Sequence, residues 1–135
     1  MTTRTISIAA AVVLVAALGG WLWGASGRSA ATRGLQAAEL RTELLGARAA
    51  ALDARIAIYS VNFGEASRHL EDARGLLRRA DERLHALGRG DDLKQLAAAL
   101  TAVDDAQRQA GKLDQNANSR AGDAAQILAD LLSRW

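Results

Sequence analysis

The chain has 135 residues, of which 17 are Lys or Arg and 15 are Asp or Glu, and it contains neither Cys nor Pro. The lack of cysteine excludes disulfide frameworks, thiolate chemistry and Cys-ligated metals. A formal charge of only +2 and an aromatic content of 4% lack the basic, aromatic-rich surface of a nucleic-acid-binding module.

An uncharged, largely apolar run over residues 5–24 is the first predicted element. About 20 apolar residues in a helix span the hydrocarbon core of a bilayer. Trp21 and Trp23 stand near the end of this run, and indole rings favour the membrane interface. We therefore expect a transmembrane signal-anchor helix at 5–24, with a short cytoplasmic head at 1–4 and a linker at 25–28.

Basic residues flank this run on both sides, so the charges barely decide its orientation. Arg4 precedes the run, whereas Arg28 and Arg33 follow it. The short basic head is similar to that of bacterial signal-anchors. We expect a single-pass protein of a bacterial inner membrane with its C-terminal domain in the periplasm. The alternative is secretion to the periplasm after cleavage of a signal peptide within residues 1–27.

Residues 29–135 are expected to form one all-α domain, an antiparallel three- or four-helix bundle. Residues that favour helices dominate this part, and strand formers are scarce. Its charges balance, because Arg4 and Arg28 account for the whole net charge. The first helix is expected at about residues 29–60. The predicted apolar side of that helix consists of Leu35, Leu44 or Leu45, Leu52, Ile56 and Tyr59.

The next helix, at about residues 63–88, has the most regular apolar pattern in the chain. Its apolar residues follow one another at alternating steps of three and four, which is the heptad pattern of closely packed helices. Large and small side chains alternate along it, which favours interdigitation with neighbouring helices. Gly88 can take the left-handed conformation that ends a helix. This predicted core seam comprises Phe63, Ala66, Leu70, Ala73, Leu77, Ala80, Leu84 and Leu87.

The remainder of the chain predicts either one long helix or two shorter ones. Asp91 or Asp92 is expected to begin a helix at about residues 91–114, whose apolar face includes Leu113. Asn and Ser at 115–119 favour a break, because their side chains compete for backbone hydrogen bonds. Gly122 offers a second place for that break, and a short final helix would then cover about 120–134. The three-helix and four-helix versions both remain open.

The segment Val61–Ala73 resembles the turn and second helix of a tetratricopeptide repeat. That family places a turn residue and an aromatic residue before a helix with small, bulky and small positions. The matching residues here are Asn62, Phe63, Ala66, Leu70 and Ala73. No second copy follows at the 34-residue period of that family, so the resemblance implies one helical hairpin. An anchor followed by such a domain is similar in layout to bacterial membrane-tethered adaptor proteins.

Glu65, His69 and Asp72 are the candidate metal ligands. Steps of four and three residues place them on one face of a helix. Carboxylate and imidazole groups can bind a divalent cation there. We favour the other interpretation, a solvated flank beside the predicted core seam, and therefore expect no bound metal.

Four arginines on the same predicted helix, Arg74, Arg78, Arg79 and Arg83, form a candidate basic patch. Such a patch can dock an anionic partner or a lipid headgroup, although a solvated face is the simpler interpretation. The sequence shows no nucleophile elbow and no glycine-rich phosphate loop. We therefore expect no catalytic residues and no cofactor, and we do not expect this chain to be an enzyme.

These features together predict a membrane-anchored, non-catalytic helical module. We expect it to bind a protein partner, or to associate with itself, through its helical hairpin. The alternative is a small metal- or ligand-binding helical bundle at the membrane surface. A nucleic-acid partner is not expected, and a small-molecule ligand is left open.

Overall fold

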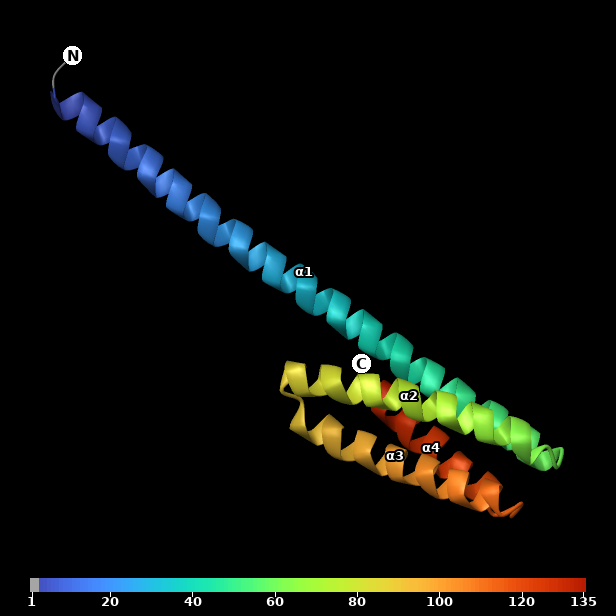
Figure 1. The fold of residues 1–135 in the computed structure, drawn as a ribbon. Coiled ribbons are helices and arrows are strands. Elements are labelled where there is room, and N and C mark those ends of the chain that lie inside the picture. Colours follow the sequence, from blue (N-terminus) through green and yellow to red (C-terminus); the bar gives the residue numbers. More distant parts are fainter. Residues whose placement is uncertain (1–2) are drawn as a thin grey trace. The chain divides into compact units, whose positions relative to one another are not determined.

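Figure 1 shows the computed structural model, which describes the backbone of residues 3–135 and the side chains of residues 30–135. All its regular elements are helices, and no strand occurs in the described part of the chain, which confirms the all-α class. The four helices are α1 (Thr3–Tyr59), α2 (Phe63–Leu87), α3 (Gly90–Gly111) and α4 (Ala117–Leu132). Of the two versions left open by the sequence, the structure therefore has the four-helix one.

The chain divides into two units, Met1–Ala37 and Ala38–Trp135. The membrane segment predicted at 5–24 belongs to the first unit. Its side chains, with those of Trp21 and Trp23, lie outside the described residues. Among the residues whose side chains are described, no helix is both long enough and apolar enough to span a bilayer.

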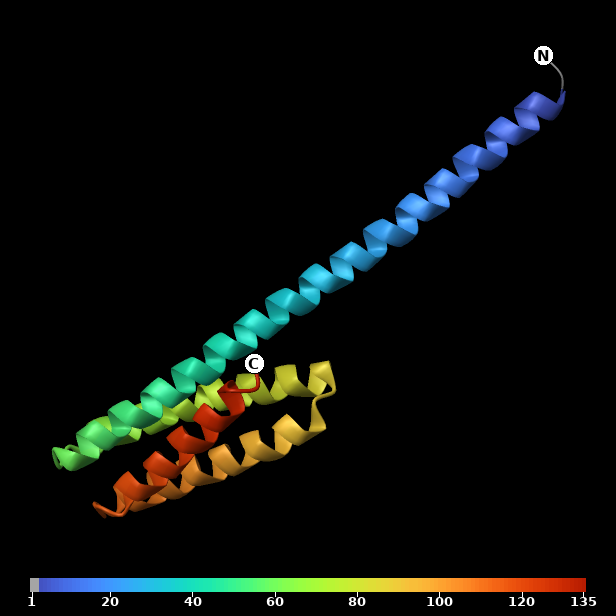
Figure 2. The ribbon, with the colours of Figure 1, turned by 180° about the vertical axis from the view of Figure 1, so that it is seen from behind.

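In the second unit, successive helices run in alternating directions, as Figures 1 and 2 show from opposite sides. The C-terminal part of α1 contributes to the same core as the other three helices. Leu44 of α1, Leu77 of α2, Val103 of α3 and Leu128 of α4 are all fully buried in that core. Ala38–Trp135 is therefore an antiparallel four-helix bundle closed around leucine and alanine side chains.

The predicted core seam, which we call the α2 stripe, lies along the buried face of α2. Seven of its eight residues are buried, from Phe63 to Leu84. Leu87 is partly buried and packs against the same cluster. Because alanine alternates with leucine along the stripe, the neighbouring helices can approach α2 closely.

Both ends of α2 are closed by short-range hydrogen bonds. At its start, the Asn62 side-chain oxygen accepts the backbone N–H of Glu65 at 3.2 Å. The Asn62 amide in turn donates to the Glu65 carboxylate at 2.7 Å, so the two side chains cap the helix reciprocally. At its end, Gly88 has a φ of 68°, and the N–H of Arg89 donates to the carbonyl of Leu84 at 3.2 Å. This is the left-handed termination expected for Gly88.

Gly88→Ala is expected to destabilise the bundle by about 1 kcal/mol, because a Cβ is unfavourable in the left-handed region. The matched control is Gly111→Ala at the end of α3, where φ is not positive and a Cβ would meet no atom within 4 Å. Thermal melts of the two variants, followed by circular dichroism, provide the measurement. Equal melting temperatures would contradict a left-handed requirement at Gly88.

The apolar side predicted for the first helix is wrong except at Leu44. Ile56 and Tyr59 are 66% and 84% exposed, Leu35 and Leu45 are also exposed, and Leu52 is half-buried. Alanines alternate with larger residues on the face that is buried, and their small side chains let α1 lie close to its neighbours. Where its side chains are described, the fully buried residues of α1 are Leu40, Leu44, Ala47, Ala51, Ala54 and Ile58.

The break between α3 and α4 comes earlier than the sequence predicts. α3 ends at Gly111, and Leu113 takes a φ of 58° and is largely exposed, so it does not belong to the apolar face. The Asp114 side chain then accepts the N–H of Asn116 at 2.9 Å. This turn satisfies backbone groups between the helices, whereas the predicted Gly122 lies inside α4.

Asp92 does not begin α3, which starts one residue before Asp91, at Gly90. Its carboxylate is instead buried, with Oδ2 2.6 Å from Arg89 and Oδ1 3.8 Å from Arg134. The Arg89 guanidinium also lies 4.2 Å from the centre of the Trp135 ring, a cation–π contact. These charges connect the residues after α4 to the turn between α2 and α3.

Candidate functional site

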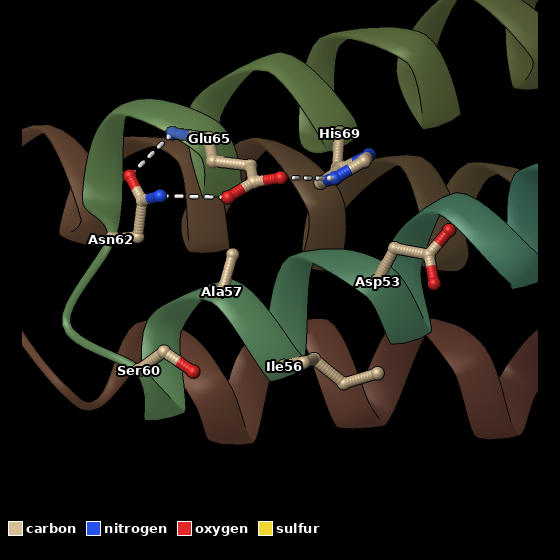
Figure 3. Close-up of a pocket in the computed structure, with 7 residues that line it drawn as sticks. All are labelled: Asp53, Ile56, Ala57, Ser60, Asn62, Glu65 and His69. Atoms are coloured by element: carbon tan, nitrogen blue, oxygen red, sulfur yellow. Dashed lines mark hydrogen bonds and ion pairs between the residues drawn. The ribbon is translucent and has the colours of Figure 1, made fainter.

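Glu65 and His69 line a groove of about 240 Å³ between the end of α1 and the start of α2 (Figure 3). One oxygen of Glu65 lies 3.8 Å from Nε2 of His69, while the other accepts the bond from Asn62. Glu65 is therefore engaged in capping α2. The groove is lined by Asp53, Ile56, Ala57, Ser60, Asn62, Glu65 and His69.

Asp72 lies outside that groove and lines a second hollow with Glu65 and His69. Arg68 and Glu71 line the same hollow, so a positive charge stands among the three candidate ligands. In the part of the chain whose side chains are described, no group of three His, Cys, Asp or Glu residues is placed to hold a metal ion. Glu65 and His69 thus line both hollows, whereas Asp72 lines only the second.

Two of the predicted patch arginines face acidic residues of α1. Arg83 lies 2.5 Å from Glu39 and donates through Nε to Glu43 at 3.0 Å. Arg79 approaches Glu43 at 3.7 Å, and the Glu43 side chain is only 10% exposed. The hydrogen bond to Glu43 is the main cause that raises the pKa of Arg83; the charges of Glu43 and Glu39 add to it, and desolvation opposes it. These contacts join the two helices α1 and α2.

The other two arginines behave differently. Arg74 points towards α3, where it lies 3.6 Å from Asp104, and it also lies 3.3 Å from Glu71. Arg78 is exposed. The four arginines therefore do not make one open basic surface, because ion pairs on two sides of α2 divide them. The signal that sequence reasoning missed is the matching four-residue spacing of the acids at 39 and 43 and the arginines at 79 and 83.

Large apolar side chains remain exposed where α1 meets α2 and where α3 meets α4. They are Ile56, Tyr59, Val61 and Leu113. The two turns lie at the same end of the bundle (Figure 1), and Arg55 and Asn118 connect the adjoining helices by two hydrogen bonds of 3.1 Å each. Exposed apolar groups that gather in one region mark interaction surfaces more often than isolated ones do.

A comparison with protein-family models, with curated proteins and with solved structures finds no match to this chain.

Proposed function

We propose that this chain is a non-catalytic helical interaction module, held at a bacterial inner membrane by residues 5–24, which binds a protein partner through its α1–α2 hairpin. The observation that carries the proposal is the exposure of Leu45, Ile56 and Tyr59 on α1. The core takes Leu40, Leu44 and Ile58 from this helix together with several alanines, while the three exposed side chains face outwards. Burying apolar surface contributes about 25 cal/mol per Å², so a partner that covers these side chains is favoured.

The tether is supported by the sequence of the first unit. The uncharged run at 5–24 has the length of a membrane-spanning helix, and Trp21 and Trp23 are residue types that favour its interface. A tether also raises the local concentration of a binding surface, which strengthens weak contacts without adding new ones. A small module held at one membrane can therefore work through a modest interface.

A photoreactive benzoylphenylalanine in place of Ile56 tests the proposal in bacterial cells that express the full chain. We expect the chain to remain in the membrane fraction after carbonate extraction and to give one discrete crosslinked product. The matched control carries the same probe in place of Ala98, an exposed residue of α3, and should give no such product. A chain found only in the soluble fraction would overturn the tether, and equal crosslinking at both positions would overturn the docking surface.

A further inference from the structure

The outward face of α1 carries a second heptad pattern. Its members follow one another at alternating steps of four and three over three heptads of the bundle part of the helix. The outer stripe, as we name it, consists of Ala38, Thr42, Leu45, Ala49, Leu52, Ile56 and Tyr59. Leu52 is half-buried and the other six are exposed. A sustained heptad with charged flanks is typical of a coiled coil.

The outer stripe lies opposite the core on the same helix. Leu44 and Ala51 face the core and are fully buried, whereas Leu45 and Leu52, one residue later in each case, belong to the stripe. Successive residues turn by about 100° around a helix of 3.6 residues per turn. The two sets therefore occupy different faces, and no helix among residues 38–135 covers the outer one.

We infer that the outer stripe is the interface of a parallel, two-stranded coiled coil formed with α1 of a second copy of this chain. This inference rests on the proposed function, whose partner it identifies. The heptad positions nearest the axis are conventionally called a and d. Here Thr42, Ala49 and Ile56 occupy a, whereas the large residues at d are Leu45, Leu52 and Tyr59. β-branched residues at a with leucine at d favour two strands.

The charges beside the outer stripe favour the parallel orientation. Arg41, Arg48 and Arg55 precede the a residues on one flank, while Glu39 and Asp53 follow d residues on the other. In a parallel coil, each residue before a faces the residue five positions later on the other helix. Arg48 then faces Asp53 of the second copy, twice in a symmetric dimer. An antiparallel coil would instead set arginine against arginine.

Arg48 and Asp53 are available for this contact. No ion pair within the described part of the chain involves either residue, and the buried Nε of Arg48 has no hydrogen-bond acceptor there. Asp53 lines the groove of Figure 3, beside Glu65 and His69. A guanidinium entering that groove would meet two carboxylates. The groove is thus suited to Arg48 of the second copy.

Single cysteines test the interface directly, because the chain has none of its own. Thr42→Cys and Ile56→Cys place a thiol near either end of the outer stripe in the full chain, purified in detergent micelles and oxidised with copper phenanthroline. In a parallel, in-register coil each thiol faces its own counterpart at disulfide distance, so each variant should form disulfide dimers. An antiparallel coil would set each thiol against a d residue of the other helix, so neither variant would form disulfide dimers, and that result would overturn the orientation.

Ala98→Cys is the matched control, since it is exposed on α3 but lies off the outer stripe. It separates contact along α1 from mere crowding of anchored chains in a micelle. We expect little dimer from this variant. Dimer yields equal to those of Thr42→Cys and Ile56→Cys would overturn the coiled coil.

A charge exchange tests the pairing of Arg48 with Asp53. In the Thr42→Cys background, Arg48→Glu replaces two attractive pairs by two repulsive ones and should weaken association about tenfold. Adding Asp53→Arg should restore it. A double variant that associates no better than the single one would overturn the pairing.

The cysteine and photoprobe experiments together separate this inference from the proposed function. If the cysteines fail to crosslink while the probe at position 56 captures a different protein in cells, this inference fails and the proposed function stands. If neither the cysteines nor the probe crosslinks, both fail.

Discussion

Leu77→Asp is expected to unfold the helical bundle. Leu77 is fully buried at the middle of the α2 stripe and packs within the core cluster. The substitution removes a leucine from the core and places a carboxylate there with no partner, at a cost of more than about 4 kcal/mol. Small domains are stable by only about 5–15 kcal/mol in total. Circular dichroism of the full chain in micelles should therefore show the cooperative melt of the bundle lost or shifted far downwards.

Arg78→Asp is the matched control, because it introduces the same carboxylate one residue later on an exposed position of α2. Surface substitutions of this kind usually change stability by less than about 0.5 kcal/mol. The melt of this variant should resemble that of the unchanged chain. Equal tolerance of the two substitutions would contradict the placement of Leu77 in the core.

The contrast between α1 and α2 shows which parts of the fold the sequence can predict. The α2 stripe was predicted residue by residue, because large apolar residues there lie on the buried face. In α1 large apolar residues stand on both faces: Leu40, Leu44 and Ile58 are fully buried, whereas Leu45, Ile56 and Tyr59 are exposed. The size of a side chain therefore does not identify the buried face of α1. Alanine also occurs on both faces, so the sequence of this helix carries two heptad patterns and only packing distinguishes them.

Local sequence preferences predict the end of α2 but miss the end of α3. Gly88 has the left-handed φ expected of it, because the preference resides in the residue itself. Leu113 adopts a similar φ that no local preference of leucine favours, so the break at residues 112–116 could not be located. The turn joins two helices that pack against each other, α3 and α4, and such packing is not visible in the local sequence.

Sequence reasoning identified residues of the candidate sites, but it did not identify the residues that they contact. Spacing along one helix placed Glu65 and His69 together, and they lie 3.8 Å apart. It could not show that Arg83 meets Glu39 and Glu43, because those contacts span 44 and 40 residues of sequence. Contacts within a helix follow from its period, whereas contacts between helices require the register of packing. Only that register shows which of the predicted patch arginines form ion pairs with acidic residues of other helices.

Glu43→Ala is expected to destabilise the bundle by about 2 kcal/mol. Its carboxylate is nearly buried and accepts a hydrogen bond from Arg83 at 3.0 Å, with Arg79 at 3.7 Å. A hydrogen bond between charged groups contributes about 1.5–3 kcal/mol when its partner is removed. The loss is moderate because the two arginines are partly exposed and can turn towards water. Urea denaturation of the full chain in micelles measures it as a lower midpoint with an unchanged slope.

Glu82→Ala is the control, since Glu82 is exposed on α2 and forms no ion pair in the described part of the chain. Its midpoint should stay within error of the unchanged chain. High salt gives a second discrimination, because it screens exposed charges but acts much less on a nearly buried pair. The difference between the two variants should therefore persist in molar salt. If it disappears there, the contacts of Glu43 are surface contacts, and alanine packing alone positions α1 against α2.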